Sequence, residues 1–233
     1  MNPFSKSVQY LRRRLADHLS WDEWSTRSWS QEGEDQILRR IFEQKSHGFY
    51  IDVGAHHPMR FSNTYLFYRR GWRGLNIDAM PGSMVPFNKK RPRDINLEVG
   101  IGLEDKEVDY YIFNEPALNG FSKEISCARD QATSIYHIEK VVKLAVRPLS
   151  SVLEGHLPAG QTIDFMSIDV EGLDLEVLQS NDWDRYRPQY VLVEVLGSSL
   201  HEIEGSRIGS LMTQAGYAIY AKCMNTVFFR NER

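Results

Sequence analysis

Short apolar runs alternate with segments of helical spacing along most of this 233-residue chain, and this alternation restricts the folds open to it. The runs have the length and apolar character of buried strands, and Gly or acidic residues end several of them. They span residues 48–53, 74–78, 95–101, 163–169 and 190–194. Strands that alternate with helices form parallel sheets, so the pattern predicts an α/β fold with a doubly wound, mostly parallel sheet.

Two later parts of the chain depart from this alternation. Residues 217–221 and 226–229, after a helix expected at 208–215, predict an antiparallel hairpin that closes the sheet. An insertion at about 104–148 carries two runs of period two around a polar segment. Loops at the ligand edge of such sheets often determine specificity, so we expect this insertion to cover a substrate site. A purely structural flap would show the same pattern.

The first 29 residues differ in character from the remainder, 30–233, which is expected to form one domain. Apolar residues at helical spacing surround the basic run 12–14 and predict an amphipathic helical extension. Such a helix could pack on the domain or pair with a second copy in a homodimer. Because the segment is basic, a weak peripheral contact with a membrane surface is the alternative.

Composition excludes several classes of protein. The 28 Lys and Arg residues against 31 Asp and Glu residues give a net charge of −3, which does not favour a nucleic-acid surface. Two cysteines, Cys127 and Cys223, cannot form a disulfide framework and are expected to be packing residues. No apolar run reaches the roughly 20 residues of a membrane span, and no signal-peptide core is apparent. We therefore expect a cytoplasmic protein without a transmembrane segment.

Acidic residues stand at the carboxyl ends of four of the predicted strands. They are Asp52, Asp78, Asp169 and Glu194. The carboxyl ends of parallel strands share one edge of the sheet, and ligands bind at that edge. One such acid could be a helix N-cap, but four together predict a binding site.

The first turn indicates which ligand this edge would accept. Residues 52–57 contain a single glycine, Gly54, and therefore lack the three-glycine fingerprint of dinucleotide-binding proteins. Clustered carboxylates would also repel a diphosphate, whereas they suit hydroxyl donors and positive charge. Asp78 lies 24 residues after Gly54, at the spacing of an acid that binds ribose hydroxyls. S-adenosylmethionine offers a ribose, an ammonium and a sulfonium, so it is the predicted cofactor.

Several short segments add a family resemblance. In chain order they are SQEGED (30–35), FYIDVGA (49–55), SNT (62–64), GWRG (71–74) with ID (77–78), PALN (116–119), SIDVEG (167–172) and RP (187–188). In this order and spacing they resemble the FkbM-type family of S-adenosylmethionine-dependent methyltransferases. The resemblance implies a class I methyltransferase, Rossmann-like fold and O-methylation of a sugar, glycan or natural-product hydroxyl. A nucleotide-dependent oxidoreductase and a non-catalytic cofactor- or glycan-binding protein are the alternatives.

The expected cofactor site combines the strand-end acids with neighbouring loops. Gly54 would let the backbone approach the methionine part of the cofactor, and Asp78 would bind its ribose. Asn63 and Thr64 could bind the cofactor carboxylate or cap the helix that follows them, and the resemblance adds two residues before the first strand. The predicted cofactor-binding residues are Gln31, Asp35, Asp52, Gly54, Asn63, Thr64 and Asp78.

Methyl transfer to a hydroxyl calls for a base or a metal beside the acceptor. Asp169 and Glu171 follow the fourth strand, and His56 and His57 follow the first, so these four are the candidate catalytic residues. Asp169, Glu171 and Glu194 could instead hold a divalent ion such as magnesium. This metal alternative is not favoured, because the spacing of the three acids is not diagnostic.

The insertion supplies the expected substrate-binding residues. Asn119, Ser122 and Tyr111 are the predicted set, with Tyr110 and Phe121 beside them. Aromatic rings next to amides suit a sugar, although such residues also pack insertions onto sheets. The expected partner is therefore a small-molecule or glycan hydroxyl acceptor.

Overall fold

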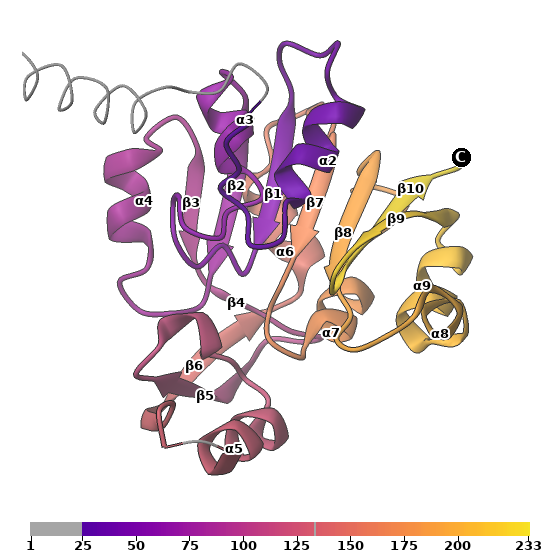
Figure 1. Ribbon diagram of the computed structural model, residues 1–233. Helices are drawn as coiled ribbons and strands as arrows, with labels where there is room; N and C mark the ends of the chain where they lie inside the picture. The colour runs from indigo at the N-terminus through magenta and orange to yellow at the C-terminus, as the bar shows by residue number, and fades with distance from the viewer. Residues whose placement is uncertain (1–24, 133) are drawn as a thin grey trace, which may run out of the picture.

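The structure is a computed structural model that describes residues 25–132 and 134–233, and a single large sheet forms its centre (Figure 1). Five strands run parallel: β1 (Phe49–Val53), β2 (Arg73–Asp78), β3 (Ile95–Glu98), β7 (Phe165–Ile168) and β8 (Tyr190–Glu194). Two antiparallel strands, β9 (Tyr217–Cys223) and β10 (Thr226–Asn231), close the edge beside β8. The order β3-β2-β1-β7-β8-β10-β9 confirms the predicted doubly wound sheet with a closing hairpin.

Helices cover both faces of this sheet. On one face lie α2 (Glu34–Ile41) and α3 (Tyr65–Arg69), and on the other lie α6 (Leu149–His156), α7 (Asp174–Gln179), α8 (Leu200–Gly205) and α9 (Arg207–Gln214). Side chains of a strand alternate between faces, so β1 contributes to both cores. Its Tyr50 packs with α2 and α3, whereas Ile51 and Val53 pack with α6 and α7. All five β1 residues are buried, as expected of a central parallel strand.

The insertion forms a small second sheet of order β4-β6-β5, which projects from the lower edge of the large sheet in Figure 1. Its elements are β4 (Gly100–Ile101), β5 (Lys106–Phe113), the 3-10 turn η1 (Pro116–Leu118), α5 (Lys123–Ala132) and β6 (Ile138–Arg147). The polar segment between β5 and β6 is thus partly helical, not irregular throughout.

The third predicted strand, 95–101, is divided between the two sheets. Residues 95–98 stay in the large sheet as β3, while Gly100 and Ile101 pair with β6 of the small one. A Cβ atom at Gly100 or Gly102 would collide with Val146 of β6. These glycines let the chain lie close to β6 as it passes from one sheet to the other.

The chain between β1 and β2 becomes helical only at Tyr65, where α3 begins. Phe61 has a left-handed φ of 57°, which interrupts a helix at that point. The Ser62 hydroxyl accepts a hydrogen bond from the Tyr65 amide at 3.1 Å and so caps the later start. The segment between β2 and β3 forms α4 (Met84–Lys90).

Most of the predicted N-terminal extension, 1–29, lies outside the described residues. Within its last part, the Trp29 ring packs against Tyr65 of α3, with ring centroids 5.6 Å apart. No helix in the described part of the chain has both the length and the apolar character that a membrane crossing requires.

The connectivity of the large sheet places a crevice between β1 and β7. From β1 the chain builds outward to β2 and β3, and it then returns to add β7 on the other side of β1. Connections on the two sides of this reversal diverge, and ligands of doubly wound sheets bind outside the strand carboxyl ends there. The four strand-end acids all lie at this edge.

Candidate active site

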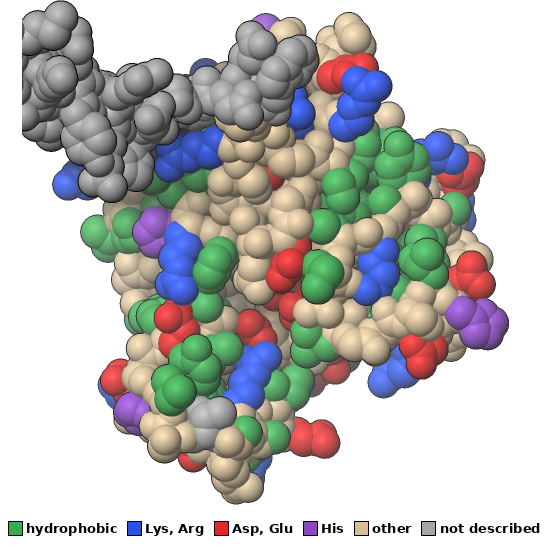
Figure 2. Space-filling model, in the orientation of Figure 1, with side chains coloured by type: hydrophobic (Ala, Val, Ile, Leu, Met, Phe, Trp, Pro, Cys, Tyr) green, Lys and Arg blue, Asp and Glu red, His purple; other side chains and the backbone are tan. Residues whose placement is uncertain are grey.

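A large pocket opens at the carboxyl edge of the sheet, between the strand ends and the small sheet. It contains about 860 Å³ of empty space, including its open mouth. Its wall includes Gly54 and His56 after β1, Asp78 and Met80 at the end of β2, Asp169 and Glu171 after β7, and Tyr110, Asn119 and Phe121 from the small sheet. Carboxylate groups lie in the middle of the face shown in Figure 2, between the two sheets.

A second, smaller pocket adjoins the first and has about 430 Å³ of empty space. Both pockets are lined by Gln31, Phe61 and Asp169. The remaining lining of the smaller pocket is polar apart from Ile168 and comprises Glu32, Glu34, Asn63, Glu194, Asn225 and Thr226. Asp169 therefore stands at the boundary between two compartments.

Gly54 brings the loop after β1 against the loop after β7. Its φ is 84°, and a Cβ atom there would collide with the carbonyl oxygen of Asp169. A side chain at this position is excluded both by the conformation and by the space. The wall of the large pocket is bare backbone at this point, so a ligand can approach it closely.

Asp78 presents a buried carboxylate to the same pocket. Its two oxygens accept hydrogen bonds from the backbone amides of His56 and Met80, each at 2.8 Å. Burial raises the pKa of Asp78, and these hydrogen bonds oppose the shift. Each carboxylate oxygen has a further lone pair, so the group can still accept hydrogen bonds from a ligand.

Asp169 and Glu194 form a pair of carboxyl groups that interact strongly. Burial among protein atoms, followed by the charge of Glu194, raises the pKa of Asp169 well above its usual range. Burial, with Glu171 and Asp174 nearby, raises the pKa of Glu194 to about 7. Two such groups cannot both ionise freely, so the pair retains a proton until near neutral pH. A carboxylate of this kind is a stronger base than an ordinary aspartate.

Comparison of the sequence with models of known protein families identifies the family of this domain. The model of the methyltransferase FkbM domain matches residues 52–219, which is more than half of the chain. The chain belongs to this family. No curated protein sequence matched it.

Solved structures that resemble this FkbM-family chain are distant from it in sequence. One is a TehB-like SAM-dependent methyltransferase from Corynebacterium glutamicum, with 9% identity over 99% of this chain and 100% of that one, at a TM-score of 0.44. Another is an O-methyltransferase from Bacillus cereus in complex with SAH, with 10% identity over 97% and 89% of the two chains, also at 0.44.

Four of the seven predicted cofactor residues of this FkbM-family domain line the pockets, and the other three do not. Gly54 and Asp78 line the large pocket, Asn63 lines the small one, and Gln31 lines both. Asn63 also donates to the Ser167 hydroxyl on β7 at 3.0 Å.

The other three predicted cofactor residues lie behind the pocket walls. Asp52 is only 6% exposed and accepts a hydrogen bond from Thr64 at 2.6 Å. Burial raises the pKa of Asp52, while the charge of Arg91 and the Thr64 hydrogen bond lower it. Asp35 is fully buried and accepts from the Ser28 hydroxyl and the Trp29 amide, which fixes the chain before α2.

The two candidate histidines occupy different environments. His56 lines the large pocket, and its Nε2 atom is buried without a hydrogen-bond partner among the described residues. Burial lowers the pKa of His56, so the ring is neutral near pH 7. His57 lies outside both pockets, and its Nδ1 atom accepts from the amides of Met59 and Arg60. Its observed contacts stabilise the turn after β1.

Glu171 forms an ion pair with a residue of the insertion. Its carboxylate pairs with Arg129 of α5 at 2.6 Å, and it has a left-handed φ of 54°. No group of three or more His, Cys, Asp or Glu side chains within residues 25–132 and 134–233 is arranged to hold a metal ion. The alternative metal set of Asp169, Glu171 and Glu194 is therefore not assembled as a ligand cluster.

The predicted substrate residues are only partly at the pocket. Asn119 lines it, with its side-chain oxygen accepting from the Phe113 amide at 2.8 Å. Tyr111 and Ser122 lie outside it, because Tyr110 takes the pocket-facing position on β5 and Ser122 caps α5 through the Ile125 amide. The alternation of side chains along β5 leaves only one of the two tyrosines on that side.

Two pocket residues carried no signal in the sequence. Phe61 lines both pockets, with the guanidinium of Arg60 4.4 Å from its ring centroid. Met80 follows Asp78 and contacts the Asn119 amide nitrogen through its sulfur at 3.3 Å. The left-handed conformation of Phe61 and the approach of the insertion to Met80 both depend on tertiary structure.

Proposed function

We propose that this FkbM-family chain is an S-adenosylmethionine-dependent O-methyltransferase that acts on a hydroxyl of a sugar, glycan or other natural product. The observation that carries the proposal is the position of Asp169 at the boundary between two pockets. A methyl donor in the large pocket and an acceptor in the small one would meet beside a carboxylate of raised pKa.

The residues of the large pocket fit such a donor. Its lining holds three carboxylates and, within the described part of the chain, no Lys or Arg, which suits a cation and disfavours the diphosphate of a dinucleotide. Asp78 has lone pairs available for ribose hydroxyls, and the bare backbone at Gly54 has room for the methionine part. The orphaned Nε2 atom of His56 offers one further hydrogen bond.

The bound donor and this chain would supply different parts of the reaction. When bound, the donor supplies an electrophilic methyl group on a positively charged sulfur. Asp169 would accept the proton of the acceptor hydroxyl and so make its oxygen a nucleophile toward that methyl group. The pocket walls align the reacting groups, and such positioning can contribute roughly 7–11 kcal/mol.

The small pocket favours a polyhydroxylated acceptor. Glu194 and Glu34 can accept hydrogen bonds from hydroxyls, and Asn63 and Thr226 can both donate and accept them. With three glutamates in its wall, the compartment would repel phosphate or carboxylate groups. We therefore propose neutral sugars or glycans before phosphorylated ones.

Calorimetric titration of the protein with S-adenosylhomocysteine, repeated with NAD, tests the cofactor class. Saturable binding of S-adenosylhomocysteine alone is the expected result. Tight binding of NAD would instead support the oxidoreductase alternative. Turnover is then measured with neutral hydroxyl acceptors, with and without magnesium and with a chelator. Cofactor binding with no methyl transfer to any hydroxyl acceptor would favour a non-catalytic binding protein.

A further inference from the structure

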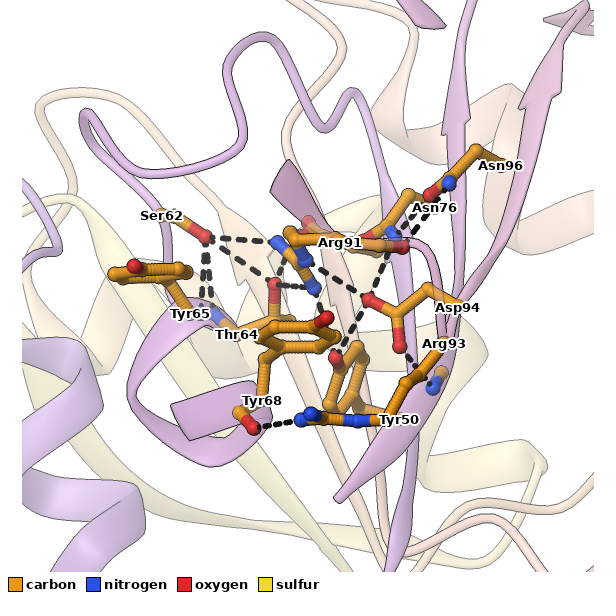
Figure 3. A network of polar contacts seen from close by, with 12 residues as sticks. Tyr50, Ser62, Thr64, Tyr65, Tyr68, Asn76, Arg91, Arg93, Asp94 and Asn96 are labelled. Carbon is orange, nitrogen blue, oxygen red and sulfur yellow. Dashed lines mark hydrogen bonds and ion pairs between the residues drawn. The ribbon is translucent and has the colours of Figure 1, made fainter. Parts of the chain in front are cut away.

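A fully buried arginine is the centre of a network of polar contacts (Figure 3). Arg91 follows α4, and its side chain has no solvent exposure. It donates to Asp94 at 2.8 Å, to the Tyr50 hydroxyl at 2.9 Å and to the Thr64 hydroxyl at 3.0 Å. A guanidinium buried to this extent is costly unless its partners are well organised.

The donor capacity of Arg91 sets the direction of the hydrogen bonds around it. A guanidinium only donates, so the Thr64 oxygen must accept from it. The hydroxyl proton of Thr64 is then free to point at Asp52, to which it donates at 2.6 Å. In the same way Tyr50 accepts from Arg91 and donates to Asp94 at 2.8 Å.

One of the two carboxylates around Arg91 is satisfied within the network. Asp94 accepts from Arg91, from Tyr50, from the Gly74 amide at 2.9 Å and from the Asn76 amide at 3.0 Å. Asp52 is the second carboxylate, and among the described residues Thr64 is the hydrogen-bonded link between it and Arg91. One buried cation thus faces two buried carboxyl groups, so the network carries one negative charge in excess when both are ionised.

This extra charge lies next to the pocket. Asp52 directly precedes Val53 and Gly54, which form part of the pocket wall. It also lies within electrostatic range of the acids at both ends of that pocket, because Asp78 raises the pKa of Asp52 and Asp52 raises that of Asp169. A charge held in a buried site acts on a neighbouring ligand with little screening.

We propose that Arg91, acting through Thr64, holds Asp52 as an ionised carboxylate beneath the donor pocket, so that the pocket binds the positively charged methyl donor more tightly than its neutral product. This inference rests on the proposed function, because it assumes that the donor is a sulfonium. S-adenosylmethionine and S-adenosylhomocysteine differ by one methyl group and one positive charge. A fixed negative charge nearby stabilises the first and leaves the second almost unaffected, which favours exchange of product for new donor.

The test is the ratio of the two dissociation constants, measured by calorimetry on the full chain without acceptor. Asp52→Asn keeps the shape and removes the charge, so we expect it to weaken S-adenosylmethionine binding about tenfold and S-adenosylhomocysteine binding less than about twofold. Thr64→Val should change the ratio in the same direction, and Thr64→Ser, which keeps the hydroxyl, should retain the native ratio. A purely structural role would not alter the ratio.

A matched control separates loss of the network from loss of any buried hydroxyl. Tyr217→Phe removes a buried hydroxyl that donates to the Pro188 carbonyl at 2.7 Å on the far edge of the sheet, and it should leave both constants unchanged. Equal weakening of both ligands by Asp52→Asn and Thr64→Val would overturn the inference while the proposed function stands. A wild-type protein that binds neither ligand would overturn both.

Discussion

Two groups of buried acids lie along the large sheet, and they are organised in opposite ways. Around Arg91, hydroxyl, amide and guanidinium donors converge on Asp94 and reach Asp52. Around Asp169 and Glu194, the neighbouring groups are mostly further carboxylates, and pKa values rise. In the first arrangement, Arg91 and the Thr64 hydrogen bond oppose the rise that burial causes in the pKa of Asp52, whereas in the second the neighbouring carboxylates add to the rise. The contrast teaches that burial alone does not decide the charge of an acid; the donors around it do.

The largest effect is expected in the group around Asp169 and Glu194, when Asp169 is replaced by Asn. We expect methyl transfer to fall by about 100- to 10,000-fold, because the acceptor hydroxyl loses its base. S-adenosylhomocysteine binding should persist, as measured by calorimetry. Glu171→Gln is the matched control, and a loss of less than about tenfold is expected since that carboxylate is paired with Arg129. The opposite ranking of the two variants would assign the base to Glu171.

Breaking the polar network around Arg91 should lower the stability of the fold. Arg91→Met leaves Asp94 and Asp52 buried without their cation, and it should lower the free energy of unfolding by about 3–5 kcal/mol. Urea denaturation measures this change. In contrast, Glu194→Gln should be neutral or stabilising, because it removes one of several mutually repelling acids. If both variants destabilised equally, the distinction between the two groups would be wrong.

The pH dependence of catalysis sharpens the comparison. A base must be ionised, so kcat/KM should fall as the pH drops through the raised pKa of Asp169, at a higher pH than for an ordinary aspartate. Glu194→Gln removes a neighbouring negative charge and should move this limb to lower pH. If the acid limb of the kcat/KM profile stays at the same pH, the charge of Glu194 does not affect the pKa of Asp169. Steady-state kinetics between pH 5 and pH 9, a range of about four units, would measure the shift.

The smallest expected effect is on the pH dependence of stability. The pKa values of Asp174 and Glu194 are raised to about 6 and about 7 in the folded protein, so between about pH 5 and 8 the folded state binds more protons than the unfolded one. Stability should therefore fall as the pH rises through this window. A thermal unfolding series should show a shallower slope for Glu194→Gln than for Glu154→Gln, a surface control of equal charge change.

The parts of this architecture that follow from local pattern could be predicted from the sequence. Strands β1 and β8 are short runs of mostly apolar residues. The rule that parallel strands share an edge was enough to bring Asp78, Asp169 and Glu194 together. The division of residues 95–101 between two sheets could not be predicted, because it depends on the packing of Gly100 against Val146.

The polar network around Arg91 could not be predicted from the sequence for a similar reason. Arg91 follows Lys89 and Lys90 and has the pattern of a solvated basic helix end. Its burial depends on partners from separate segments, such as Tyr50 and Thr64, which meet only in the folded chain. Thr64 was predicted at the cofactor site, and its observed contacts connect that site to the network behind it.

The packing of Gly54 against the Asp169 carbonyl sets the spacing between two loops through main chain alone. The side chain at position 169 takes no part in that contact. A substitution at position 169 would therefore replace the proposed base and leave the separation between the loops after β1 and β7 unchanged. An engineer who wished to install a different reaction here would alter position 169 and leave position 54 untouched.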